Sequence, residues 1–149
     1  MKRIDLPPVW LTLFVMLAWI QAQFYPMGLG FGGAWADFAG GLLVGGGLVL
    51  MALAFAEFRK HRTTLIPHNT PSALVQSGIF TRTRNPIYLG DALVLAGLIL
   101  RFDAVLSLPL IPIFVWVIER RFILPEEARM RREFKAVFAK YERKVRRWI

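Results

Sequence analysis

Apolar residues occur along the chain in four long stretches, separated by short charged or glycine-rich segments. The stretches cover residues 8–25, 38–58, 86–101 and 104–120. A helix that crosses a bilayer needs about 20 mostly apolar residues, with about 17 as the lower limit, and the first two stretches meet this requirement. A cleaved signal peptide is disfavoured for the first stretch, because the stretch is long and the bulky residues at 21–24 make a poor cleavage site.

The third and fourth stretches are shorter and interrupted. Asp91 lies within the third, and Pro109 and Pro112 lie within the fourth. At about 1.5 Å per residue, a helix over 86–100 is only about 22 Å long. We therefore expect a tight hairpin that turns at 101–103 and either crosses the bilayer fully or stops within it. The whole pattern predicts an all-α, multi-pass membrane helix bundle with about four spans.

Positive charge is distributed unevenly between the stretches. The chain of 149 residues has 19 Lys and Arg against 10 Asp and Glu, which gives a formal net charge of +9. Basic residues gather before the first stretch, between the second and third, and after the fourth, whereas the connection 26–37 has none. Because cytoplasmic loops of membrane proteins carry such an excess, both termini and the 59–86 loop are expected in the cytoplasm. The asymmetry accounts for the net charge without a nucleic-acid partner, and the length fits a single domain over 1–149.

The C-terminal segment 121–149 is expected to form a cytoplasmic amphipathic helix, either one long helix or a bent pair. Pro125 suits its first turn, and Glu126 and Glu127 match the positive end of its dipole. Apolar residues follow at helical spacing, at positions 130, 134, 137, 138, 141 and 145. The other faces are basic, so anionic lipid headgroups are expected partners of this helix.

Residue types that support other chemistries are absent or badly placed. The chain has no Cys, which excludes disulfides, thiolate nucleophiles and iron–sulfur clusters. His61 and His68 lie seven positions apart in a basic loop without a nearby carboxylate, so we expect no metal site. In the second stretch, Gly41 and Gly45 form a small-xxx-small pattern, which favours helix packing within one bundle over a dimer interface.

The start of the third stretch carries the most distinctive polar residues. Asn85 suits a helix N-cap and Pro86 the first helical position, so the helix is expected to begin at the membrane surface. Its free N–H groups and the neighbouring Arg84 would favour an anion there. Asp91 follows about a turn and a half later. A carboxylate inside a membrane segment predicts a functional role, with Arg82 or Arg84 as its expected partner.

Two motifs in register resemble the integral-membrane methyltransferases, the superfamily of isoprenylcysteine carboxyl methyltransferases and phospholipid methyltransferases. The first is Arg84-Asn85-Pro86-Ile87-Tyr88-Leu89-Gly90, preceded by Gly78 and Phe80. The second comprises Glu126, Glu127, Met130, Phe134, Lys135, Phe138, Tyr141 and Val145, followed by Arg147 and Trp148. The resemblance covers roughly residues 63–149. Asn85 replaces the usual His and cannot act as a general base, while Met130, Lys135 and Phe138 replace Leu, Gly and Tyr.

The resemblance implies transfer of a methyl group from S-adenosylmethionine to a lipophilic acceptor at the cytoplasmic face. The acceptor would be an isoprenylcysteine-type carboxylate, held by Arg129 or Arg132, or a phospholipid-type amine, whose proton Glu126, Glu127 or Asp91 would take. The implied catalytic residues are Glu127, Arg132 and Asp91. The implied cofactor-binding residues are Gly78, Arg84, Asn85, Pro86, Tyr88, Gly90, Glu126, Glu127, Phe134 and Tyr141.

Two other functions remain open from the sequence. Some membrane reductases have a similar architecture and use NADPH, whose extra phosphate would need further Arg contacts such as those in the 59–84 loop. A non-catalytic membrane protein whose basic tail binds anionic lipid also fits the composition. The methyltransferase interpretation depends on the segment 84–86 and the two glutamates at 126–127 lying together around one cavity.

Overall fold

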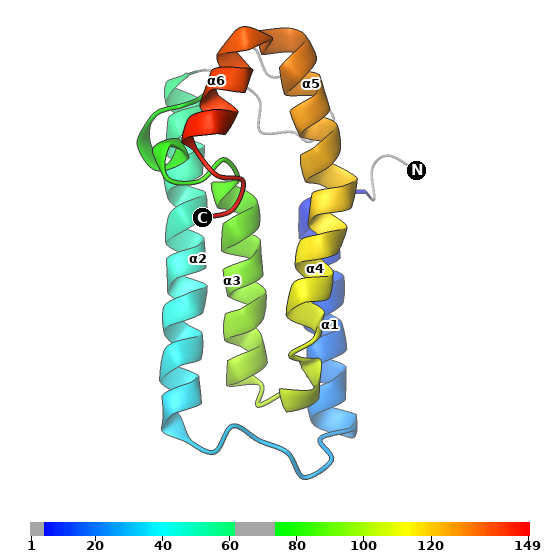
Figure 1. Ribbon diagram of the computed structural model, residues 1–149. Helices are drawn as coiled ribbons and strands as arrows, with labels where there is room; N and C mark the ends of the chain where they lie inside the picture. The colour runs from blue at the N-terminus through cyan, green and yellow to red at the C-terminus, as the bar shows by residue number, and fades with distance from the viewer. Residues whose placement is uncertain (1–4, 62–73) are drawn as a thin grey trace.

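The computed structural model describes residues 5–61 and 74–149, and every regular element in these ranges is helical (Figure 1). Lys2, Arg3 and Arg62, which belong to the basic residues counted in the charge pattern, and His68 lie outside the described residues. The α-helices are α1 (Pro7–Phe24), α2 (Ala34–Lys60), α3 (Pro86–Arg101), α4 (Leu110–Ile118), α5 (Leu124–Phe134) and α6 (Ala136–Lys144). Shorter turns are the 3-10 turns η1 (Gly78–Thr81) and η2 (Val105–Ser107) and the π-turn η3 (Glu119–Ile123).

Helices α1 and α2 are each long and apolar enough to cross a membrane. Only 17% of the most apolar 18-residue window of each helix is buried inside the protein. Large apolar side chains such as Trp19, Phe24, Phe38 and Leu42 are exposed. An exposed apolar surface of this extent is typical of a membrane-facing or protein-facing surface. Helix α3 has 16 residues and α4 has nine, so neither meets the same length criterion alone.

Helix α3 lies between α2 on one side and α1 and α4 on the other (Figure 1). Leu95 and Ile99 of α3 pack in one core cluster with Phe14 of α1 and with Phe114 and Ile118 of α4. The expected hairpin turn is confirmed, because α3 ends at Arg101 and the chain reverses before α4. At the same end of the bundle, the Asp103 carboxylate accepts a hydrogen bond from the Phe31 amide at 2.6 Å, which ties this turn to the α1–α2 connection.

Two pairs of glycines let α2 and α3 approach to backbone contact. A Cβ built on Gly97 would lie 2.5 Å from the Gly40 carbonyl oxygen, and one built on Gly90 would lie 2.6 Å from the Gly47 carbonyl oxygen. The expectation that Gly41 and Gly45 form the close-packing face is wrong. A Cβ on Gly45 would meet nothing within 4 Å, because the contact repeats every seven residues and falls on Gly40 and Gly47.

We expect Gly97→Ala to destabilise the protein by about 1–3 kcal/mol, because the new methyl group must push backbone atoms apart. The matched control is Gly46→Ala on α2, whose Cβ meets no atom within 4 Å. That change should leave stability unchanged or raise it by up to about 1 kcal/mol through helix propensity. Thermal unfolding in detergent measures both. Equal melting temperatures for the two variants would contradict the packing described.

The predicted span 104–120 and the predicted helix start at Pro125 require α4 to end before the C-terminal segment. In the structure, α4 instead continues into that segment. The backbone stays helical from Leu110 to Phe134, and the π-turn Glu119–Ile123 joins α4 to α5. Pro125 lies in the first turn of α5, where the widened turn before it tolerates the missing N–H. The break comes at Lys135, with φ 48° and ψ −118°, so the segment is the bent pair α5 and α6.

Lys135 has a positive φ, a backbone conformation that residues other than glycine disfavour. The family that the two motifs resemble has Gly at this position. We expect Lys135→Gly to stabilise the protein by about 1 kcal/mol, because relief of strain exceeds the added freedom of the unfolded chain. Lys140→Gly, an exposed position inside α6, should instead cost about 1 kcal/mol. Thermal unfolding of the two variants should therefore shift in opposite directions. A loss of stability in both would show that Lys135 is not strained.

Candidate active site

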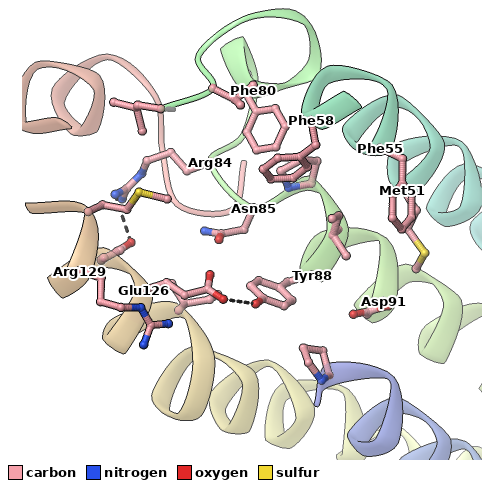
Figure 2. A pocket seen from close by; sticks show the side chains of 18 of the residues that line it. Met51, Phe55, Phe58, Phe80, Arg84, Asn85, Tyr88, Asp91, Glu126 and Arg129 are labelled. Carbon is pink, nitrogen blue, oxygen red and sulfur yellow. Dashed lines mark hydrogen bonds and ion pairs between the residues drawn. The ribbon is translucent and has the colours of Figure 1, made fainter. Parts of the chain in front are cut away.

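A cavity of about 480 Å³ opens at the end of the bundle where α5 and α6 lie (Figure 2). Its size falls within the range of about 300–1,000 Å³ that is usual for small-ligand sites. Much of the wall is apolar and comes from the start of α1, the second half of α2, and η1. The polar residues at the wall are Arg84, Asn85, Tyr88, Asp91, Glu126, Glu127, Arg129 and Tyr141. The cavity thus joins the start of α3 to the start of α5, as the methyltransferase interpretation requires.

The start of α3 is held by the C-terminal segment rather than by its own cap. Pro86 takes the first helical position, but the Asn85 side chain makes no capping hydrogen bond. Its Nδ2 instead donates to the Arg147 carbonyl oxygen at 2.9 Å, and the Arg84 amide donates to the Arg146 carbonyl oxygen at 3.0 Å. Asn85 is therefore the N-cap residue, as expected, but its side chain does not cap the helix. The Asn85 side-chain amide instead donates its hydrogen bond to the backbone of the C-terminal segment.

Glu127 is buried, with 5% of its surface exposed, and it is surrounded by arginines. Arg147 binds it through two hydrogen bonds, from Nε to Oε2 at 2.9 Å and from Nη2 to Oε1 at 2.8 Å. Arg84 Nη1 lies 3.1 Å from Glu127 Oε2. Hydrogen bonding to Glu127 raises the pKa of Arg147, so this guanidinium stays charged. Such pairing is what makes a buried carboxylate tolerable.

Glu126 takes a different direction from its neighbour and joins α5 to α3. Its Oε1 accepts a hydrogen bond from the Tyr88 hydroxyl at 2.6 Å, and Figure 2 shows the two side chains meeting across the cavity. Glu126 is half-buried and lies beside Arg129 on α5. This carboxylate and the Arg129 guanidinium provide an anion and a cation in the wall of the same cavity.

Arg84 is largely buried, with a side chain 12% exposed, and it lies between two carboxylates. Its Nη1 is 3.1 Å from Glu127 and 3.5 Å from Glu142. Despite these ion pairs, Arg84 Nε and Nη1 donate no hydrogen bond to any described residue. Buried donors without acceptors are costly, and an anionic ligand in the cavity would satisfy them.

Asp91 lies further along α3, towards the start of α1, and faces the same cavity (Figure 2). It is 5% exposed, and its Oδ2 has no hydrogen-bond partner among the residues in 5–61 and 74–149. The expected pairing of Asp91 with Arg82 or Arg84 is not found. Arg84 is directed to Glu127 and Glu142, and Arg82 is exposed. The carboxylate is therefore left facing a largely apolar part of the cavity.

Four of the expected site residues lie away from the cavity wall. Gly90 packs against Gly47, and Gly78 has φ 62° and no room for a Cβ beside the Glu57 carboxyl group. Phe134 packs in a second apolar cluster, and Arg132 is exposed on α5. The expected residues that do line the cavity are Arg84, Asn85, Pro86, Tyr88, Asp91, Glu126, Glu127 and Tyr141.

Other residues at the site were not among the predicted site residues, although Arg147 belongs to the second motif. Arg147 binds Glu127, and it also binds Glu119 of the π-turn, with Nη1 to Oε1 at 2.9 Å. A buried glutamate needs a cation to neutralise it. The spacing of the arginines along the sequence does not show which of them lies beside Glu127. Met51 and Phe55 of α2 line the cavity as well, and in the sequence they are ordinary members of an apolar stretch.

Tyr141 of α6 lines the cavity and fixes η1. Its hydroxyl donates to the Phe80 carbonyl oxygen at 2.7 Å, and burial raises the pKa of Tyr141. The Phe80 ring in turn packs edge-on against Phe58 of α2, with ring centroids 5.3 Å apart. These contacts build an aromatic wall from three elements on one side of the cavity.

Comparison with known proteins agrees with this arrangement. A family model described as phospholipid methyltransferase matches residues 35–137, which run from the start of α2 to the start of α6 and include most of the cavity wall. No curated protein and no solved structure gives a significant match. Because the family model spans most of the chain, this membrane protein belongs to the phospholipid methyltransferase family.

Proposed function

We propose that the protein transfers a methyl group from S-adenosylmethionine to a membrane-embedded lipid acceptor. Membership of the family supports a methyltransferase that acts on a lipid. One observation carries the finer proposal. Arg84 with unsatisfied donors, the Glu126 carboxylate and the Asp91 carboxylate all line a single cavity of about 480 Å³.

The residues at the cavity mouth fit the polar groups of the proposed cofactor. Arg84 would bind its carboxylate, because buried guanidinium donors favour a bidentate anion. Glu126 would accept hydrogen bonds from its ribose or ammonium group. Tyr88, Phe80 and Tyr141 offer ring surfaces for the adenine. When bound, S-adenosylmethionine supplies an electrophilic methyl group on a positively charged sulfur.

The inner part of the cavity favours an amine as the acceptor. Asp91 would bind an ammonium headgroup and take one of its protons, so that the freed nitrogen lone pair can form the new bond to the methyl carbon while the carbon–sulfur bond breaks. The surrounding Met51, Phe55, Pro7 and Pro8 side chains are apolar and would exclude water from the reacting groups. Orientation of the two substrates in this dry space would supply most of the acceleration.

A carboxylate acceptor of the isoprenylcysteine type is the second candidate, and Arg129 is the observation that favours it. Arg129 lines the cavity mouth, whereas Arg132, the other expected partner of such an acceptor, is exposed. An acceptor carboxylate bound by Arg129 would lie close to Glu126 on the same helix. Repulsion between these two anions makes the amine the better fit.

We also propose how the protein lies in the membrane. Helices α1, α2 and α3 and the helical segment that begins with α4 would be the four spans of a single domain, with both termini and the cavity mouth in the cytoplasm. The positions of the basic residues support this orientation. Exposed cations on α5 and α6, including Arg132, Lys140 and Arg143, would contact anionic lipid headgroups.

Incubation of the purified protein with methyl-labelled S-adenosylmethionine and a total lipid extract tests the proposed function. We expect the label in an amine-containing lipid, and label in a lipid methyl ester would favour the second acceptor class. NADPH oxidation without methyl transfer would indicate a membrane reductase instead. If neither reaction occurs but the protein binds vesicles of anionic lipid, the enzyme proposal is wrong.

A further inference from the structure

Arg147 connects three parts of the site. Its guanidinium makes two hydrogen bonds to Glu127 of α5 and one to Glu119 of the π-turn. Its carbonyl oxygen accepts hydrogen bonds from the Asn85 side chain at 2.9 Å and from the Thr83 hydroxyl at 3.3 Å. Through one residue, the C-terminal segment therefore fixes the start of α3, the π-turn and α5 relative to one another.

The two carboxylates beside Arg84 are each bound by another arginine. Arg147 makes the paired hydrogen bonds to Glu127, and Arg131 makes paired hydrogen bonds to Glu142, both at 3.0 Å. Arg84 is close enough to be attracted by both carboxylates, at 3.1 and 3.5 Å, but Nε and Nη1 donate no hydrogen bond to a described residue. The attraction holds the guanidinium in place without hydrogen bonds from these two buried donors.

Removal of Arg147 would change this balance. Glu127 is 5% exposed and cannot exchange its lost partner for water without rearrangement. The nearest remaining cation is Arg84, at 3.1 Å, whereas Arg131 is at 3.6 Å and half-exposed. Glu127 would therefore turn to Arg84 and accept hydrogen bonds from its unsatisfied donors.

We propose that Arg147 is a positioning residue for the methyltransferase site: by occupying Glu127, it keeps the Arg84 donors free for the anionic group of the ligand. This inference rests on the proposed function, because the ligand is the proposed cofactor. It assigns Glu127 to the support of Arg84 rather than to contact with the reacting atoms, and it leaves Glu126 as the member of the glutamate pair that faces the ligand.

Calorimetric binding of S-adenosylhomocysteine to the detergent-purified full chain tests this role. Arg147→Ala should weaken binding about tenfold, because Glu127 then competes for Arg84. Adding Glu127→Gln to that variant should restore affinity to within about threefold of the unchanged protein, since a neutral amide competes poorly for Arg84. A residue needed only for folding would give the opposite pattern, with the double variant weaker than either single variant.

Two further variants keep the test decisive. Arg143→Ala removes an exposed cation of α6 and should leave affinity unchanged. Arg147→Lys retains the charge with one hydrogen bond in place of two, and should give an affinity between those of Arg147→Ala and the unchanged protein; it replaces Arg147→Ala if that variant does not fold. Unchanged affinity in the Arg147 variants, or no rescue by Glu127→Gln, would overturn the proposal. Failure of the unchanged protein to bind would instead reject the proposed function.

Discussion

Replacement of Arg84 by Ala should weaken S-adenosylhomocysteine binding about 100-fold, because the variant loses two or more charge-assisted hydrogen bonds in a buried site. The Arg84 side chain is 12% exposed and has unsatisfied donors, so a bound anion would gain most of the energy of these bonds. Glu127 keeps its two hydrogen bonds from Arg147 in the variant. The protein should therefore remain folded, and calorimetry can be compared directly with the unchanged chain.

Arg82→Ala is the matched control for this prediction, since Arg82 lies two positions away and is exposed. Its affinity should equal that of the unchanged protein. If Arg84→Ala binds with unchanged affinity, the anion site lies elsewhere. If both variants weaken binding equally, Arg84 contributes to affinity only through the general positive charge of this surface.

The second large effect is expected for Asp91→Asn. The substitution keeps the shape of the side chain but removes the proton acceptor, so kcat with an amine acceptor should fall by about 10²–10⁴-fold. Affinity for S-adenosylhomocysteine should be unchanged, because Asp91 lies away from Arg84 along the cavity (Figure 2). Stability should not fall, since a buried neutral amide costs less to desolvate than a buried carboxylate.

Asp37→Asn serves as the control, because Asp37 is in the first turn of α2 at the opposite end of the bundle. Single-turnover methyl transfer with the acceptor at saturation separates the chemical step from binding. Full activity in Asp91→Asn would exclude Asp91 as the base. Loss of cofactor binding would place Asp91 in the cofactor site rather than beside the acceptor.

The sequence predicted the helices better than it predicted their contacts. Long apolar stretches and Pro86 marked α1, α2 and the start of α3, because chain length and helix-start preferences act locally. The glycines that pack α2 against α3 are Gly40 and Gly47 rather than the predicted Gly41 and Gly45. A seven-residue contact repeat becomes visible only when the orientation of the partner helix is known, and Gly40 pairs with Gly97 across 57 positions of the chain.

The same limit applies to the candidate site. The two motifs predicted that Arg84 and the Glu126–Glu127 pair lie together, and the separation of 3.1 Å between Arg84 and Glu127 confirms it. The partner of Glu127 could not be predicted, because Arg147 reaches it only after the break at Lys135 turns the chain back. The continuous helix through the π-turn was missed for a related reason, since Pro125 usually signals a helix start.

An experimental structure of the protein with S-adenosylhomocysteine tests the central claim most directly. The account predicts the ligand in the cavity between α3 and α5, with its carboxylate within hydrogen-bond distance of Arg84 and with Glu126 as an acceptor of its hydroxyl or ammonium donors. A ligand bound outside this cavity, or a cavity filled by side chains with Arg84 directed away from it, would contradict the account.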